Sequence, residues 1–236
     1  MKGNDRIIFA IGLAALALLI IGIFPNIGLT YDSHLYLRLS ENLLEEGFAQ
    51  SSFGSKPPLY PILLWVLQNN LILISIFNVA CWTVSMVLVH KLLIRKIEND
   101  FYQISFAAIV LFSTPVFMVH NFAWTESVFL VFVLGFLFLQ VHPRSNPRLN
   151  TVLSMLLLVG MVALKHLGIG LVLGFGALHL WNNRSLRHAL VYAPAILFFF
   201  LWQLKSYSIR GDLSRLDHST GLDLLQNLNW MGQSLI

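Results

Sequence analysis

Residues 30–61 read TYDSHLYLRLSENLLEEGFAQSSFGSKPPLYP, and this polar stretch decides how the rest of the chain is interpreted. It lies between an apolar run at residues 7–24 and a long series of further apolar runs. Four apolar side chains recur in it at helical spacing with charges between them: Tyr36, Leu39, Leu43 and Leu44. The pattern predicts an amphipathic helix lying along a membrane surface, and Gly47 is expected to end it.

The same stretch places a carboxylate and an ammonium group on either side of this helix. Asp32 follows the first apolar run, and Lys56 precedes two prolines, which fix an extended approach to the next apolar segment. Such an order can hold a polar headgroup whose tail stays in lipid. The alternative interpretation is a merely hydrophilic loop between two membrane spans.

The composition indicates a polytopic membrane protein. Hydrophobic residues make up 57% of the chain and charged residues 11%, with a mean hydropathy of +0.73, whereas soluble domains have about 25% charged residues. The net charge of +4 does not indicate nucleic-acid binding, because the cations are scattered among short loops. The single cysteine, Cys81, lies in an apolar run, which excludes a disulfide framework and a cysteine metal site.

We therefore expect an all-α transmembrane bundle of about seven spans. The runs expected to cross the bilayer are residues 7–24, 71–93, 104–119, 122–141, 149–164, 167–181 and 189–204. The run at 59–67 is too short to span and is expected to be re-entrant or interfacial. Residues 149–181 are too long for one crossing, so we divide them at Lys165-His166.

The distribution of cations orients the bundle in a cell membrane. With the N-terminus cytoplasmic, nine of the 15 Lys and Arg residues fall in cytoplasmic stretches. Residues 1–208 then form the transmembrane domain, with the active site in the first outer loop at 25–70. Residues 209–236 form an extracytoplasmic polar tail.

Charged side chains at membrane depth are functional candidates, and those of this chain gather near the outer ends of the predicted spans. Asp32 is the expected general base, with capping of a helix that begins near Ser33 as the alternative. Glu126 is the expected second carboxylate, with stabilisation of its own helix dipole as the alternative. Lys56 is expected to contact a phosphate as a point charge, with snorkelling to the interface as the alternative.

The remaining candidates are weaker. Lys165 is a second cation that can bind a phosphate group, and His166 beside it is either a substrate contact or a turn residue. Tyr60 and Trp124 are candidates for stacking on a substrate. The spacing of the outer histidines, which are His34, His120 and His218, matches no compact zinc site, so no metal site is predicted.

The order D-S-x-x-Y-x-x-L-x-x-N-L-L-x-x-G-F from Asp32, followed by K-P-P-L-Y-P from Lys56, resembles the first extracytoplasmic loop of GT-C glycosyltransferases. The most similar branch is the bacterial one of protein O-mannosyltransferases and the lipid A aminoarabinose transferase. The resemblance implies transfer of a sugar from a polyprenyl-phosphate donor to a lipid, glycan or protein acceptor, with inversion and with Asp32 as the catalytic carboxylate that activates the acceptor. No cofactor is implied, and a requirement for Mg²⁺ or Mn²⁺ stays open.

The chain departs from this pattern in two motifs and in length. Relatives carry Asp-Glu where this chain has Asp32-Ser33, and an Arg where it has Lys165. Because relatives are about twice as long, we expect this chain to correspond to their N-terminal half, with a partner subunit as one way to complete it. The alternative function is that of a non-catalytic lipid-phosphate binder or transporter subunit in a cell-envelope assembly.

Overall fold

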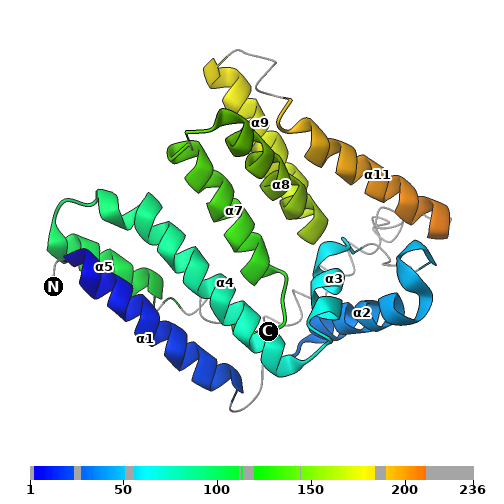
Figure 1. Ribbon diagram of the computed structural model, residues 1–236, viewed down its shortest axis with the longest axis horizontal. Coiled ribbons are helices and arrows are strands. Elements are labelled where there is room, and N and C mark those ends of the chain that lie inside the picture. Colours follow the sequence, from blue (N-terminus) through cyan, green and yellow to red (C-terminus); the bar gives the residue numbers. More distant parts are fainter. Residues whose placement is uncertain are drawn as a thin grey trace, which may run out of the picture.

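The computed structural model describes residues 3–23, 28–50, 56–111, 113, 120–143, 145–183 and 190–210. Within these residues the elements are helices, which confirms the predicted all-α class (Figure 1). They are α1 (Gly3–Ile23), α2 (Tyr31–Gln50), α3 (Leu59–Val66), α4 (Leu71–Leu92), the 3₁₀ turn η1 (Ile94–Lys96), α5 (Asp100–Leu111), α7 (Glu126–Val141), α8 (Pro147–Leu164), α9 (Leu167–Asn183) and α11 (Ala193–Arg210).

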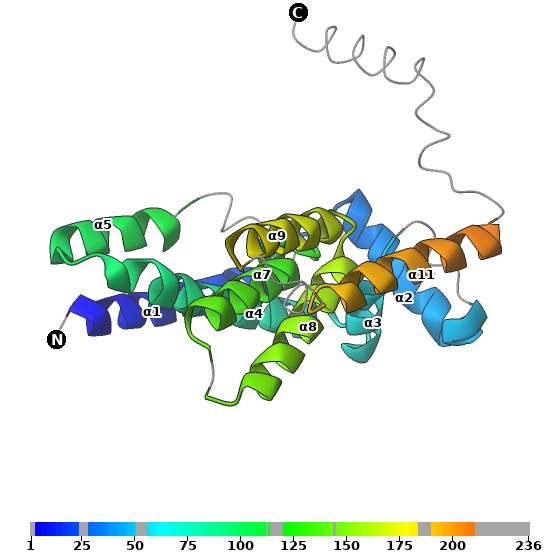
Figure 2. The ribbon, with the colours of Figure 1, turned by 90° about the horizontal axis from the view of Figure 1, so that it is seen from above.

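The long helices lie side by side in a row. From one edge to the other the packing order is α5, α1, α4, α7, α8 and α11, and α9 packs on both α8 and α11 (Figure 1). Seen from above, the arrangement is flat, with α5 and α9 raised on the same side of the row (Figure 2). The paired helices α2 and α3 lie beside one set of helix ends, where α3 contacts α8. We call this side of the row, where α1 and α8 finish and α4 and α7 begin, the loop end.

The predicted number of spans is not borne out. Among the described helices, α4 and α8 are long and apolar enough to cross a membrane, which makes two and not seven. Other predicted spans form helices below the ~20 residues that a crossing needs: α5 has 12 residues, α7 has 16 and α9 has 17. For α7 the physical reason is visible, because the residues before Glu126 pair with Gly28 instead of extending the helix.

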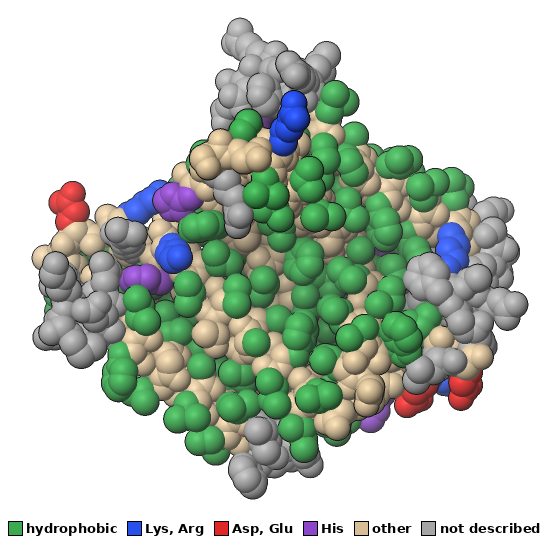
Figure 3. Space-filling model, in the orientation of Figure 1, with side chains coloured by type: hydrophobic (Ala, Val, Ile, Leu, Met, Phe, Trp, Pro, Cys, Tyr) green, Lys and Arg blue, Asp and Glu red, His purple; other side chains and the backbone are tan. Residues whose placement is uncertain are grey.

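Large apolar side chains remain exposed along the outward faces of the row. Examples that are more than half exposed come from α5, α8, α9 and α11, namely Ile109, Leu156, Leu178 and Leu201. Figure 3 shows hydrophobic side chains over most of the face that it presents. Soluble monomers rarely expose contiguous apolar surface of more than a few hundred Å². The described faces are therefore of the kind that another apolar phase or protein covers.

Helix α2 is amphipathic as predicted. Tyr36, Leu39 and Leu43 are buried, whereas the charged residues between them are exposed. The side chain of Leu44 lies outside the described residues. The predicted stop at Gly47 is wrong, because α2 continues to Gln50. Glycine inside a helix costs about 1 kcal/mol relative to alanine, an amount that the packing of α2 against α3 can offset.

Two tight turns set the positions of the helices at the loop end. Between α3 and α4, Gln68 and Asn69 adopt left-handed backbone conformations, and Asn70 then caps α4 by accepting from the amides of Ile72 and Leu73. The short α3 agrees with the prediction that residues 59–67 do not span.

The predicted division between α8 and α9 is confirmed at Lys165-His166. The backbone of Lys165 is extended, and the turn is close enough that a Cβ on Gly168 would lie 2.5 Å from the carbonyl oxygen of Met161. Only glycine therefore fits at position 168 without a shift of the backbone. This turn fixes where the side chain of Lys165 emerges.

Candidate functional site

A short backbone bridge joins the segment after α1 to the segment before α7. The amide of Gly28 donates to the carbonyl of Asn121 (2.8 Å), and the amide of Ala123 donates to the carbonyl of Gly28 (3.2 Å). From α4, the buried Asn78 donates to the carbonyl of Phe122 (2.8 Å). A Cβ on Gly28 would lie 2.5 Å from the Phe122 ring, so the approach is close. The bridge places the start of α2 and the start of α7 at the same end of the row.

Thr30 caps α2, and Asp32 does not. The Thr30 hydroxyl accepts from the amide of Ser33 (3.4 Å), while the Ser33 hydroxyl accepts from the amide of Thr30 (3.1 Å). This reciprocal pattern is that of a capping box, with serine in the place of the usual Glu or Gln. Trp124 also donates its indole N–H to the Thr30 hydroxyl (2.8 Å). The alternative role of Asp32 as a cap is therefore wrong, and its carboxylate is available for other contacts.

Asp32 pairs with Lys56. The Lys56 ammonium lies 3.1 Å from the Asp32 carboxylate and 5.4 Å from the centroid of the Tyr36 ring. The lysine side chain is only 16% exposed, whereas that of Asp32 is 57% exposed. Two buried prolines follow Lys56, so its backbone position is fixed. Because the carboxylate is largely solvated, the pair is weak and an incoming anion can compete for the lysine.

Glu126 pairs with Lys165. Glu126 is the first residue of α7 and Lys165 follows the last residue of α8, so the ion pair ties together two neighbouring helix ends. Each side chain is about one-third exposed. The Thr125 hydroxyl also donates to the Glu126 carboxylate (3.1 Å). An acid at this position stabilises the α7 dipole as well, so both predicted interpretations of Glu126 stay open.

Tyr60 packs against Tyr36, the residue over whose ring Lys56 lies. Its ring is 1% exposed and stands edge-on to that of Tyr36, with 5.1 Å between the centroids. Burial, Tyr36 and the negative charge of Glu126 each raise the pKa of Tyr60, in that order of size. The phenol is therefore neutral and able to donate, yet its oxygen has no hydrogen-bond partner among the described residues. An unpartnered buried hydroxyl is costly unless a ligand or water satisfies it.

Both ion pairs adjoin one buried cluster. Lys56 lies over the ring of Tyr36, the charge of Glu126 acts on Tyr60, and both tyrosines belong to this cluster. The members are Tyr36, Tyr60, Leu64, Ile74, Cys81, Ala123, Val128 and Leu164. The cluster joins α2, α3, α4, α7 and α8 at the loop end. It gives the two ion pairs a common apolar base.

His166 faces α11. Its ring stands edge-on to Phe199, with 6.1 Å between centroids, and its Nδ1 lies 3.4 Å from the amide nitrogen of Gln203. It occupies the turn between α8 and α9, as one of its two predicted roles requires. Trp124 stacks on Phe122 (4.7 Å), so one face of its indole is already covered.

The outer histidines do not gather in the described part of the chain. His34 is exposed, His120 is buried, and His218 lies outside the described residues. Within that part, no group of three or more His, Cys, Asp or Glu side chains could hold a metal ion. Both ring nitrogens of His120 lack a hydrogen-bond partner among the described residues, and burial lowers its pKa to about 4.

Several residues that shape the site were not singled out from the sequence. Thr30 and Ser33 could have been recognised as a T-x-x-S cap before an amphipathic run. Asn78 could have been noticed as a polar residue inside an apolar segment. The contact between Tyr36 and Tyr60 has no local signal, because it depends on how α2 packs on α3.

Because the comparisons with known proteins found no match, the site is interpreted from its own residues. No protein-family model, no curated protein and no solved structure matches this chain. The resemblance of the loop to GT-C enzymes therefore stays a prediction.

Proposed function

We propose that this protein is a membrane glycosyltransferase of GT-C type, which moves a sugar from a polyprenyl-phosphate donor to an acceptor at the extracytoplasmic face. The observation that carries the proposal is the arrangement at the loop end. Four charged residues from four separate segments form two carboxylate–lysine pairs over one buried cluster, with the unpartnered hydroxyl of Tyr60 beside them. Carboxylates can move protons and lysines can hold phosphate.

We place the helix row in the cell membrane as a polytopic bundle with a cytoplasmic N-terminus. The exposed apolar faces and the full-length helices α4 and α8 support this placement. Shorter helices can cross where neighbouring helices cover them or where water reaches them. The loop end then faces outward. Most of the predicted polar tail at 209–236 lies outside the described residues, which end at 210.

In the proposed reaction, Asp32 accepts the proton of the acceptor hydroxyl or amine. The acceptor atom forms a bond to the anomeric carbon as the bond from that carbon to the phosphate oxygen breaks on the opposite face, which inverts the centre. The electron pair leaves with the polyprenyl phosphate. Lys56 and Lys165 stabilise the negative charge that develops there.

The ion pairs give this reaction a resting state and a bound state. Before the donor binds, each lysine is neutralised by a carboxylate. A donor phosphate that takes over Lys56 would release the solvated carboxylate of Asp32 toward the acceptor. In this proposal Tyr60 donates its hydroxyl, which has no partner among the described residues, to a polar group of the substrate, and Glu126 orients Lys165.

The test compares Asp32→Asn with Glu41→Gln, a matched loss of one negative charge at an exposed position of the same helix. Mass spectrometry of envelope lipids and glycans would compare cells with and without each variant. We expect Asp32→Asn to abolish the sugar-modified product, typically a loss of about 100-fold or more, and Glu41→Gln to retain it. Full product with Asp32→Asn would overturn the catalytic role.

The second candidate is a non-catalytic lipid-phosphate binder or transporter subunit. The observation in its favour is that both carboxylates already pair with lysines, an arrangement that a phosphate can replace without any proton transfer. Binding of a polyprenyl phosphate, measured by native mass spectrometry in nanodiscs, separates the two. An enzyme binds it and yields a modified product in cells, whereas a binder retains it and yields none with the wild-type chain.

A further inference from the structure

A second charged cavity lies at the end of the row opposite to the loop end. It has a volume of about 400 Å³ and is lined by Lys91, Lys96, Phe138 and His142. Lys91 belongs to the last turn of α4 and Lys96 to η1, whereas Phe138 and His142 come from the end of α7. The cavity therefore sits at the seam where α4 and α7 finish side by side. Figure 3 shows Lys or Arg and His side chains gathered at this edge of the surface.

The cations of this cavity are held without being neutralised. Lys91 lies 5.7 Å from the centroid of the Phe138 ring, and Phe138 in turn contacts His142, with 4.9 Å between the ring centroids. An aromatic face attracts an ammonium group but leaves its positive charge in place. No carboxylate is among the described residues that line the cavity, and the described residues contain no ion pair that involves either lysine. This contrasts with the loop end, where Lys56 and Lys165 each have an acidic partner.

The shape and position of the cavity fit a phosphate group on a headgroup. Two lysines can supply point charges to phosphate oxygens. The volume of about 400 Å³ is within the range of small-molecule sites. The apolar ring of Phe138 offers a wall on which the uncharged part of the headgroup can rest. Basic pockets between helices at the cytoplasmic side are typical places for anionic headgroups.

We propose that this cavity binds the phosphate of an anionic membrane lipid from the cytoplasmic leaflet. The site is separate from the proposed donor site, because the two lie at opposite ends of α4 and α7. It uses none of the residues to which the glycosyl transfer is assigned. Its occupant would hold the ends of α4 and α7 together on the side away from the chemistry.

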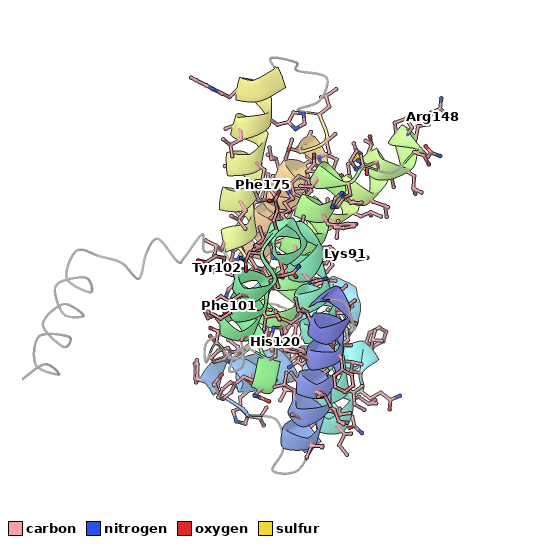
Figure 4. The ribbon with its side chains drawn as sticks, turned by 90° about the vertical axis from the view of Figure 1, so that its left-hand side faces the viewer. Lys91, Phe101, Tyr102, His120, Arg148 and Phe175 are labelled. Atoms are coloured by element: carbon pink, nitrogen blue, oxygen red, sulfur yellow. The ribbon has the colours of Figure 1, made fainter. Side chains whose placement is uncertain are left out.

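The test uses the full chain in nanodiscs of phosphatidylcholine that contain a minor fraction of phosphatidic acid or phosphatidylglycerol. Native mass spectrometry measures the anionic lipid retained by the wild type and by Lys91→Gln and Lys96→Gln. The matched control is Arg148→Gln, which removes one positive charge near the same end of the row. Arg148 is exposed and points away from the bundle (Figure 4).

We expect each lysine variant to weaken anionic-lipid retention about five-fold, as the loss of one lysine near an anionic headgroup implies. Arg148→Gln should retain wild-type binding, and Lys91→Arg should rescue most of it. An equal loss with Arg148→Gln would overturn the proposal, because it would indicate general surface charge. The absence of any preference for anionic lipid in the wild type would overturn it as well.

A competition arm identifies the source of the phosphate. Glycerol 3-phosphate in solution presents the same group without acyl chains. Retention of lipid in its presence supports a headgroup site, whereas displacement at concentrations comparable to those of the lipid would overturn the lipid assignment in favour of a soluble phosphate. Thermal unfolding of each variant in the same nanodiscs confirms that the chain is folded when it is measured.

Discussion

The Tyr60 ring stands edge-on to the Tyr36 ring, with 5.1 Å between the centroids, and Lys56 lies over the same Tyr36 ring. This series of contacts connects the solvated pair of Asp32 and Lys56 to the buried interior. Its innermost member carries a hydroxyl without a hydrogen-bond partner among the described residues. The loop end therefore combines exposed charge with a buried donor that no described residue satisfies.

Tyr60→Phe is expected to separate stability from function. Removing a buried, unpartnered hydroxyl should leave the unfolding free energy unchanged or raise it by about 1 kcal/mol. If the hydroxyl serves the substrate, polyprenyl-phosphate binding or product formation should fall about ten-fold. Thermal unfolding in detergent and native mass spectrometry measure the two quantities. A less stable variant with normal binding would show that the hydroxyl has a purely structural role.

Thr30→Val tests the cap of α2. The variant loses the hydroxyl that accepts from the Ser33 amide and from the Trp124 indole, and we expect a loss of about 1–2 kcal/mol of stability. Thr151→Val is the control, because that hydroxyl only donates to a carbonyl in its own exposed helix turn. Thermal unfolding compares the two, and equal midpoints would contradict the capping geometry.

Gly168 and Gly170 form a matched pair in the first turn of α9. A Cβ at position 168 would collide with the backbone of α8, whereas a Cβ at 170 meets nothing within 4 Å. Gly168→Ala should destabilise the protein by about 1–3 kcal/mol through overpacking, and it should weaken phosphate binding because the turn also positions Lys165. Gly170→Ala should be neutral or stabilise by up to about 1 kcal/mol. Thermal unfolding of both variants in the same detergent measures the difference. A higher midpoint for Gly168→Ala than for Gly170→Ala would contradict the turn geometry.

His120 is expected to make stability depend on pH. Burial lowers its pKa from 6.5 to about 4, so the folded state binds the proton more weakly than the unfolded state does. The contribution of His120 to the free energy of unfolding is therefore fully present above pH 6.5. It decreases as the pH falls toward 4, by about 3 kcal/mol at most. His120→Gln should remove this pH-dependent contribution to stability, whereas the contributions of the acidic groups should remain. Unfolding midpoints of both proteins across that range provide the measurement, and parallel curves would refute the prediction.

Much of the helix pattern could be predicted because it is local. The short run at 59–67, the amphipathic face of α2 and the division at Lys165-His166 each depend on nearby residues, and each agrees with the structure. The end of α2 and the start of α7 could not be predicted in this way. Helix α2 continues past Gly47 to Gln50, and the pairing of residues 121–123 with Gly28 delays α7.

For the candidate site, the sequence predicted which residues lie at the same end of the helices, but not how they pair. The sequence placed Asp32, Lys56, Glu126 and Lys165 at one end because successive apolar runs alternate in direction. It contained no information on which acid meets which lysine, since those contacts depend on helix rotation and on side-chain rotamers. The cavity between α4 and α7 was missed for a related reason: its lysines lie among other cations of the same stretch, and Phe138 reads as one more apolar residue.

The bridge at Gly28 also has a mechanical consequence. Two backbone hydrogen bonds join Gly28, just before α2, to Asn121 and Ala123, just before α7, and the Asn78 side chain ties this bridge to α4. A displacement of the beginning of α2 would consequently move the beginning of α7 with it, together with the carboxylate of Glu126. The bridge thus couples the position of Asp32 on α2 to that of Glu126 on α7.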